Sequence, residues 1–315
     1  MTGRESAIRG KLYELSVGFH LNNGNDVVTI SPQKTKISVM TNEIRVNYND
    51  YEKLDKHAKQ ASEQIKTELD KNGHGTIDEV AWVANGKTYE YYTGIESAGA
   101  KADLMLRLQS TDMSQSYNLV GISLKYNKNT TTLRNTSISS FAEKMDISSI
   151  YLVSYHINHL NTAKMYGFTG NDKENHEKWR LVRDEPIDTP LGKISAIIKR
   201  SSNESRKDIA REIAKHLKNM DQKTLVKRLI DYICPLPNIP EYQASTCPVS
   251  GETVISCLRH EIEKIFSDIK TLDVFVHNGT TCYVKVNGKK VVALEVVNKG
   301  RPLKKPEVKP MICIK

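Results

Sequence analysis

The stretch KADLMLRLQSTDMSQSYNLVGISLKY, residues 101–126, contains the pattern around which the rest of the chain can be arranged. Two short runs, DLML and LVGI, lie on either side of a polar segment, which is typical of a β-hairpin. Asp103 stands at the start of the first strand, and Ser123 and Lys125 stand two residues apart near the end of the second. Because side chains alternate between the faces of a strand, Ser123 and Lys125 share one face, so an acid, a hydroxyl and a lysine can meet.

This combination of side chains suits one kind of chemistry. A carboxylate can hold Mg²⁺, a hard cation that prefers oxygen ligands. A lysine ammonium beside it can orient a water or stabilise the negative charge that develops as a phosphodiester is attacked. The hairpin therefore indicates a site for phosphodiester hydrolysis, and the alternative interpretation is an ordinary surface hairpin.

At these residues the chain resembles the PD-(D/E)xK nuclease superfamily, in the variant whose second half-motif is S-x-K. Ala102-Asp103 takes the place of the Pro-Asp pair, and Ser123-Leu124-Lys125 takes the place of the (D/E)-x-K tripeptide. The resemblance implies that Asp103 binds Mg²⁺, that Lys125 positions the attacking water, and that cleavage leaves a 5′-phosphate. Ser123 cannot ligate a metal as a carboxylate does, so the site needs a second acid.

Glu14 is one candidate for this acid. Residues 6–22 read as an amphipathic helix, and beside its apolar stripe Gly10, Glu14 and Gly18 form a second line at helical spacing. Two glycines inside a helix each cost about 1 kcal/mol relative to alanine, so they indicate that something approaches the helix closely there. The superfamily often places a glutamate from an N-terminal helix beside its metal site. A solvated surface glutamate is the alternative interpretation.

Glu143 is the rival candidate. A short helix over 137–146, with Ser137 or Ser139 as its N-cap, would present Glu143 next to an apolar side. In some S-x-K restriction enzymes of the superfamily the second acid lies on the helix that follows the lysine strand. Here too a solvated helix acid is the alternative, and both glutamates could serve.

The order of elements extends the resemblance over residues 1–160. Expected in sequence are a helix at 6–22, short strands within 26–48, a helix at 50–72, a strand at 76–84, a second strand after the Asn85-Gly86 turn, the hairpin, the helix at 137–146 and a strand at 150–155. This matches the αβββαβ core of the restriction-endonuclease-like fold, which is a mixed α/β (α+β) architecture.

The second half of the chain is expected to add two further segments. Residues 161–235 would form a helical basic segment, irregular up to about 200 and then helical over 204–233. Residues 236–315 would form a small α+β unit with a helix at 253–270 and a basic tail. Its three strands are expected at 272–277, 281–286 and 290–297, joined by two Asn-Gly turns.

The charge distribution favours a nucleic-acid partner. The chain of 315 residues has a formal charge of +9, and its excess lies mainly in 199–228, with ten Lys or Arg against four acids, and in 299–315, with six against one. DNA is expected more than RNA. The candidate DNA contacts are Lys128, Arg134, Lys304 and Lys305. Solvated charged faces are the alternative, and the C-terminal unit would provide either DNA contacts or contacts in a homodimer.

The remaining features bound the class of protein. No apolar run approaches the roughly 20 residues that span a bilayer, and the N-terminus lacks the apolar region of a signal peptide. Five cysteines without a C-x-x-C pair indicate reduced thiols, so we expect a cytoplasmic protein without membrane association. The leading hypothesis is a Mg²⁺-dependent DNA endonuclease of restriction or phage type. Its alternatives are a catalytically silent nucleic-acid-binding protein and a basic structural or assembly protein.

Overall fold

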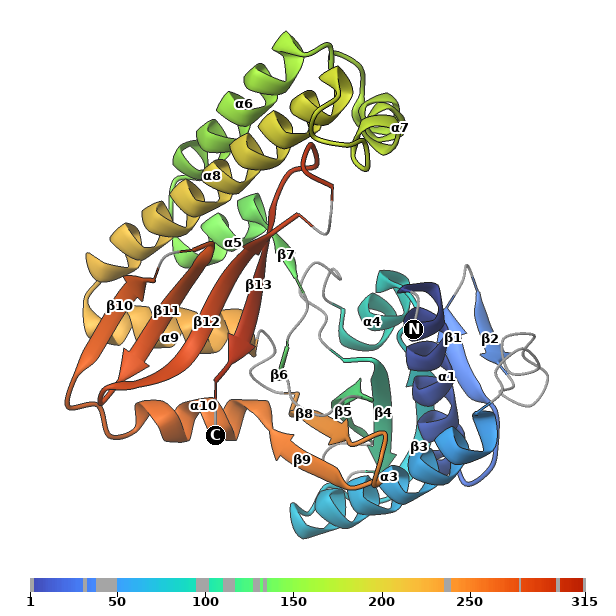
Figure 1. The fold of residues 1–315 in the computed structure, drawn as a ribbon. Helices are drawn as coiled ribbons and strands as arrows, with labels where there is room; N and C mark the ends of the chain where they lie inside the picture. Colours follow the sequence, from blue (N-terminus) through green and yellow to red (C-terminus); the bar gives the residue numbers. More distant parts are fainter. Residues whose placement is uncertain are drawn as a thin grey trace. The chain divides into compact units, whose positions relative to one another are not determined.

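The computed structural model describes residues 3–30, 33–37, 50–94, 102–109, 117–126, 131–132, 135–234, 239–277, 279–298 and 301–313. The chain divides into two compact units, one formed by 1–131 and 234–263 and the other by 132–233 and 264–315 (Figure 1). Each unit thus combines segments that are far apart in sequence. The boundaries expected from the sequence, after residues 160 and 235, are therefore wrong, because the chain leaves the first unit and later returns to it.

The first unit contains a seven-stranded sheet with the strand order β2-β1-β3-β4-β5-β8-β9. Its strands are β1 (Val27–Ile30), β2 (Lys34–Ile37), β3 (Ile77–Trp82), β4 (Leu104–Gln109), β5 (Tyr117–Lys125), β8 (Glu241–Thr246) and β9 (Thr253–Cys257). Its helices are α1 (Gly3–Leu21), α3 (Tyr51–Lys71) and α4 (Gly86–Thr93), and α10 (Leu258–Phe266) follows β9. The architecture is mixed α/β, as expected from the sequence.

The predicted hairpin is confirmed as β4 and β5, which pair in antiparallel register with Leu104 opposite Ile122. Helices α1 and α3 pack on one face of the sheet, where Leu104, Ile122 and Tyr242 belong to a core that excludes water. Helix α4 lies on the other face through Tyr89, which packs against a smaller cluster containing Met105. Apolar side chains on both faces of the central strands therefore fix the hairpin between helices.

Two elements of the first half were assigned wrongly from the sequence. After β3 the chain forms α4 and not a second strand, because the side chain of Asn85 accepts a hydrogen bond from the Thr88 amide at 3.2 Å and caps the helix. The segment 150–155 is part of helix α6 and not a strand. An apolar run of this length fits a buried strand or a buried helix equally well. The strand beside β5 is instead β8, which pairs with it in parallel.

The second unit contains a sheet of strand order β10-β11-β12-β13-β6, and β7 also pairs with β13. Its strands are β6 (Thr131–Thr132), β7 (Thr136–Ser137), β10 (Leu272–Val276), β11 (Thr281–Val286), β12 (Lys289–Val297) and β13 (Glu307–Ile312). Its helices are α5 (Ile138–Met145), α6 (Ser149–Met165), α7 (Asp172–Val182), α8 (Pro190–Lys218) and α9 (Gln222–Ile233). The three predicted strands are confirmed as β10, β11 and β12.

Local capping explains where the sequence assignments failed in this half. The region 160–200 is helical and not irregular, because Pro190 starts α8 behind the Thr189 cap, a position where its missing N–H costs nothing. The expected single helix over 204–233 is two helices, since Asp221 accepts a hydrogen bond from the Thr224 amide and starts α9. Residues 253–257 form β9 and not the start of a helix. The tail contains β13, which pairs with β12.

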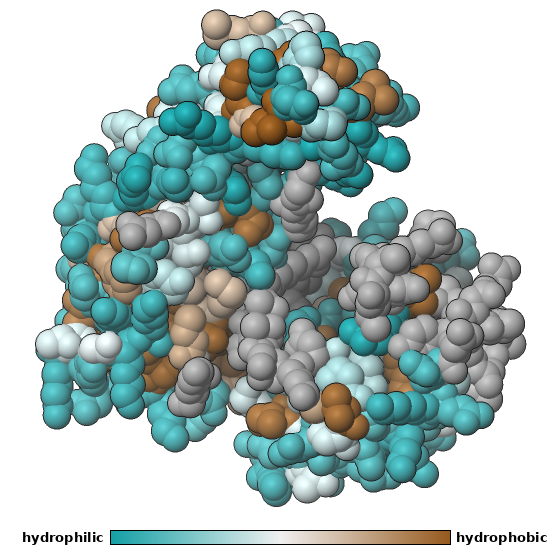
Figure 2. Space-filling view, viewed as in Figure 1, coloured by the Kyte–Doolittle hydropathy of each residue, from teal (hydrophilic) through white to brown (hydrophobic). Residues whose placement is uncertain are grey.

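Hydrophilic side chains dominate the surface, with hydrophobic ones gathered in places (Figure 2). Several large apolar side chains of the second unit are exposed, among them Met165, Leu181 and Ile187. Among the described residues, no helix is both long enough and apolar enough to cross a membrane.

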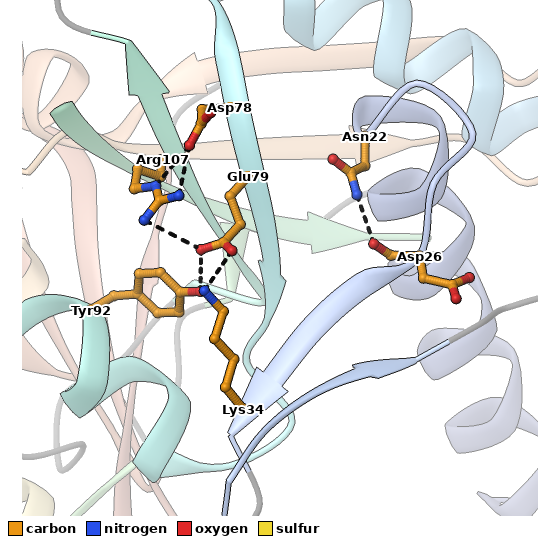
Figure 3. Close-up of polar contacts among 7 residues, drawn as sticks. All are labelled: Asn22, Asp26, Lys34, Asp78, Glu79, Tyr92 and Arg107. Atoms are coloured by element: carbon orange, nitrogen blue, oxygen red, sulfur yellow. Dashed lines mark hydrogen bonds and ion pairs between the residues drawn. The ribbon is translucent and has the colours of Figure 1, made fainter. Parts of the chain in front are cut away.

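A polar network joins four elements of the first unit (Figure 3). Glu79 on β3 accepts from Lys34 at 2.6 Å and from the Tyr92 hydroxyl at 2.6 Å, while Arg107 on β4 donates to Asp78 at 2.7 Å and lies 3.9 Å from Glu79. Burial alone would raise the pKa of Glu79. The hydrogen bonds from Lys34 and Tyr92 have the opposite effect and hold this pKa below its ordinary value. The network therefore ties β2 and α4 to the central strands.

Gly10 and Gly18 of α1 have different surroundings, and this leads to a stability prediction. A Cβ on Gly18 would lie 2.8 Å from Cγ1 of Val27 and 3.3 Å from Cδ2 of Leu104, so Gly18→Ala is expected to lower the free energy of unfolding by about 1–3 kcal/mol. A Cβ on Gly10 would meet nothing within 4 Å, so Gly10→Ala is expected to raise it by up to about 1 kcal/mol. Urea unfolding of both variants measures the difference. Equal changes in the two variants would contradict this account of the helix.

Candidate active site

The backbone of Asp103 is held from two sides. Its N–H donates to the carbonyl oxygen of Ile122 at 2.7 Å, and its own carbonyl oxygen accepts from the amide of Val83 at 2.9 Å. Asp103 therefore lies between the end of β3 and the end of β5, immediately before β4. The position of its carboxylate is set by strand pairing and not by a free loop.

The predicted cluster of acid, hydroxyl and lysine is present around Oδ2 of Asp103. This oxygen accepts from the amide of Leu124 at 2.6 Å, from Oγ of Ser123 at 3.3 Å and from Nζ of Lys125 at 3.3 Å. Ser123 is buried, whereas the side chains of Asp103 and Lys125 are 24% and 23% exposed. No described residue donates to Oδ1, so one oxygen of a strongly oriented carboxylate remains for a ligand from solvent.

Glu14 on α1 belongs to the same cluster. Its Oε2 accepts from Nε1 of Trp82 at 2.9 Å. Burial and the charge of Asp103 raise the pKa of Glu14 from 4.5 to about 7, against the opposing effects of Trp82, Lys125 and Lys11. Two carboxylates that repel each other in a partly buried place hold either a proton or a cation. The sequence-based placement of Glu14 near Asp103 therefore agrees with the structure.

The geometry of α1 explains how Glu14 reaches this place. Gly18 permits the close approach of the helix to the sheet, as its predicted role requires. Tyr13, directly before Glu14, stacks on Tyr126 with ring centroids 4.6 Å apart, and its hydroxyl forms a hydrogen bond with Oγ1 of Thr246 at 2.5 Å. Tyr126 follows Lys125 directly. The helix and the end of β5 are thus fixed to each other on either side of the cluster.

Arg9 is a cation of α1 that the sequence analysis missed and that lies beside Tyr126, the residue after Lys125. Its guanidinium lies 5.5 Å from the ring centroid of Tyr126, and it precedes Gly10, whose Cα faces open space. Guanidinium groups bind phosphate through several donors at once. The spacing in the sequence does not reveal it, because Arg9 lies five residues before Glu14 and therefore on a different face of α1.

Strand β8 adds a second group that sequence reasoning could not find. In the parallel pairing of β5 and β8, Gln243 lies opposite Ser123, and Ser245 lies opposite Lys125. Gln243 is 3% exposed and donates through Nε2 to Oγ of Ser245 at 3.0 Å, while no described residue donates to its Oε1. Beside Ser123 there is thus a buried carbonyl oxygen that a water can satisfy. Nothing in the sequence indicates that β8 joins this sheet.

The donor set is sparse for a metal ion. Among the described residues, no group of three or more His, Cys, Asp or Glu side chains is placed to hold one. Mg²⁺, however, keeps several waters and is usually bound through one or two carboxylates together with substrate phosphates. The oxygens of Asp103 and Glu14 fit that smaller requirement, and burial together with the charge of Asp103 raises the pKa of Glu14 although Lys125 and Lys11 oppose the shift.

The other predicted site residues lie elsewhere or outside the described residues. Glu143 is exposed on α5 of the second unit, so its place in a metal site stays a prediction. Lys304 pairs with Glu307 at 3.2 Å, and Lys305 donates to Oγ of Ser139 at 2.7 Å, which shows that both lysines have partners within the chain. Lys128 and Arg134 lie outside the described residues.

Comparisons with models of protein families, with curated proteins and with solved structures found no match to this chain. Its function is therefore inferred from the chemistry of the residues around Asp103.

Proposed function

We propose that this chain is a Mg²⁺-dependent nuclease that hydrolyses the phosphodiester bonds of DNA. One observation carries the proposal: Ser123, Leu124 and Lys125 all donate to one oxygen of Asp103, and the second acid, Glu14, is close enough for the Asp103 charge to raise its pKa. Strands that only needed to pair would not require two mutually repelling carboxylates beside a lysine. Perturbed acids of this kind are typical of catalytic sites.

In this proposal each residue has a separate role. Asp103 and Glu14 would hold Mg²⁺, which when bound neutralises negative charge on the scissile phosphate. Lys125 orients the attacking water through its ammonium, and Ser123 keeps the Asp103 carboxylate in place by donating to Oδ2. Water adds to phosphorus as the bond to the 3′-oxygen breaks, and that oxygen leaves with a proton, so the products are a 5′-phosphate and a 3′-hydroxyl.

The fold supports the resemblance to the PD-(D/E)xK superfamily in part. An N-terminal helix with Glu14 and an antiparallel hairpin with Asp103 and Lys125 have the expected order. The strand that completes the αβββαβ order would be β8, which pairs with β5 in parallel after the long excursion of the chain through the second unit. With the net charge of +9, this favours DNA as substrate and an endonuclease of restriction or phage type.

A catalytically silent nucleic-acid-binding protein is the second candidate. It is favoured by Ser123, which stands where most of the superfamily has an acid, and by the small number of metal ligands among the described residues. Such a protein would keep the fold and the positive charge and lack the chemical step.

An incubation with four substrates tests the proposal and separates the two candidates. Supercoiled plasmid, linear duplex, single-stranded DNA and RNA are each incubated with the full chain, with Mg²⁺ or with a chelator. We expect cleavage of DNA that requires Mg²⁺ and leaves 5′-phosphate ends, detected by end labelling with and without phosphatase. Binding without cleavage on all four substrates would favour the silent protein and reject the nuclease.

A further inference from the structure

The sheet of the second unit has one face against helices and one partly open face. Helix α8 packs against β10, β11 and β12, and α5 packs against β13. Along β11 the burial alternates, so that Cys282 and Val284 are buried while Tyr283 and Lys285 between them are only partly buried. Because side chains alternate between the faces of a strand, the residues of the open face lie on the side of the sheet away from α8.

Two aromatic rings lie next to each other on this open face. Phe275 on β10 is directly opposite Tyr283 on β11 in the antiparallel register. Their ring centroids are 5.4 Å apart, and the ring planes are inclined by 24°, so the rings are stacked. Both side chains are partly exposed. A stacked pair that the core does not cover offers flat apolar surface to a planar ligand.

Lysine ammonium groups lie over both rings. Nζ of Lys285 is 4.4 Å from the ring centroid of Phe275, and Nζ of Lys290 is 4.2 Å from that of Tyr283. The register shifts between Val284 and Lys285, and the Asn287-Gly288 turn that follows brings Lys289 to the same end of the sheet. The ring faces are thus covered by the ends of flexible side chains and not by packed core atoms, so they can be uncovered at little cost.

The charge around the rings is mainly positive, although Asp273 lies opposite Lys285 in the strand register and 4.0 Å from Nζ of Lys218. Among the described residues, Lys285, Lys289 and Lys290 form no ion pair with a carboxylate, whereas Lys309, farther along the sheet, pairs with Glu295 at 3.5 Å. Cations beside an aromatic pair fit a partner that has both planar apolar groups and regularly spaced negative charges. Single-stranded nucleic acid is such a partner, since its bases stack on aromatic rings and its phosphates bind lysines.

We propose that Phe275, Tyr283, Lys285 and Lys290, here called the aromatic–lysine face, bind single-stranded nucleic acid. A base stacks on the rings, and the lysines that cover them move to the flanking phosphates. A duplex fits less well, because its bases are already stacked on each other and do not expose a face. This binding activity goes beyond the proposed nuclease function and does not depend on the Asp103 cluster.

The test compares two labelled 12-mers by fluorescence anisotropy with the full chain in the presence of a chelator. One is oligo-dT and the other is an abasic oligomer with the same number of phosphates. We expect oligo-dT to bind more tightly. Phe275→Leu and Tyr283→Leu are each expected to weaken oligo-dT binding roughly 5- to 100-fold, since stacking contributes about 1–3 kcal/mol per base. Binding of the abasic oligomer is expected to be unchanged, which also shows that the variants fold.

Matched controls separate stacking from charge. Tyr151→Leu removes an exposed aromatic ring from α6 of the same unit and is expected to change neither affinity. The double substitution Lys285→Gln with Lys290→Gln is expected to weaken the binding of both oligomers. It should also reduce the slope of log affinity against log salt concentration by about 0.7 per lysine. The same substitution at Lys227, which is exposed on α9, is expected to have no such effect.

Three results would overturn this proposal. They are equal affinity for oligo-dT and the abasic oligomer, an unchanged affinity in both Leu variants, and a duplex that binds as tightly as the single strand. Binding is measured with a chelator and can be repeated in Lys125→Ala, so the result does not depend on cleavage. A failure of the binding proposal can therefore be distinguished from a failure of the nuclease proposal. Cleavage without oligo-dT binding rejects the aromatic–lysine face alone, and oligo-dT binding without cleavage rejects the nuclease alone.

Discussion

Lys125→Ala is expected to lower the rate of DNA cleavage roughly a thousandfold, because the ammonium acts on the developing charge and on the water and not on the rest of the substrate. Its Nζ lies 3.3 Å from Oδ2 of Asp103, where both side chains are partly exposed and within reach of a phosphate. DNA affinity is expected to change by less than about threefold, since a single phosphate contact contributes little to the total charge effect. Single-turnover cleavage with saturating enzyme, and anisotropy in the presence of a chelator, measure the two quantities.

Asp103→Asn is expected to have an effect of the same size for a different reason. The amide oxygen of asparagine can still accept from the amide of Leu124, so the hairpin should keep its register while the charge that would hold Mg²⁺ is lost. Thermal unfolding checks that the variant is folded. Lys36→Ala, an exposed lysine on β2 of the same unit, is the matched control and should cleave normally. Wild-type rates in Lys125→Ala or in Asp103→Asn would reject the assignment of the site.

Glu14→Gln is expected to remove most of the activity and at the same time to stabilise the protein at alkaline pH. In the folded protein burial and Asp103 raise the pKa of Glu14 to about 7, whereas the unfolded chain has the ordinary value of 4.5. The folded state therefore binds the proton more tightly. The stability that this proton provides is fully present below pH 4.5 and is lost as the pH rises through 7. Glutamine keeps the acceptor for Trp82 and carries no charge.

The wild type should accordingly lose stability between about pH 4.5 and 7, and the variant should not show this loss. At pH 8 we expect Glu14→Gln to be more stable by on the order of 2 kcal/mol, since one pKa unit corresponds to about 1.4 kcal/mol. Mg²⁺ at pH 8 should raise the unfolding temperature of the wild type and leave that of the variant nearly unchanged. Urea unfolding across this pH range, with and without Mg²⁺, measures both effects.

Glu143→Gln is the matched control for this prediction. Glu143 is exposed on α5 of the second unit. Its substitution should not change the stability measured without Mg²⁺. If Glu143→Gln abolishes cleavage while Glu14→Gln cleaves normally, the second metal ligand is Glu143, and the pairing of Glu14 with Asp103 has no catalytic role. Loss of activity in both variants would indicate that both carboxylates take part.

The local pattern of the sequence determined the central hairpin and the cluster built on it. Alternation along β5 places Ser123 and Lys125 on one face, and the pairing of β4 with β5 brings Asp103 to them. Helical spacing singled out Gly10, Glu14 and Gly18. The close packing at Gly18 confirms that the helix approaches the sheet there, whereas a Cβ at Gly10 would meet nothing within 4 Å. These features depend on residues that are near in sequence, where backbone period and turn chemistry leave few alternatives.

The tertiary structure alone decided which distant strands complete the two sheets. Strand β8 brings Gln243 beside Ser123. The segment that the sequence indicated to be a basic tail contains β13, which is an inner strand of the second sheet. Backbone hydrogen bonds pair any two strand edges of suitable length, so the amino-acid pattern of β5 does not specify its partner. The run 150–155 is helical for a related reason: α6 packs on α8 through Leu152, His156 and His159 at helical spacing, a contact that the local pattern of apolar residues does not reveal.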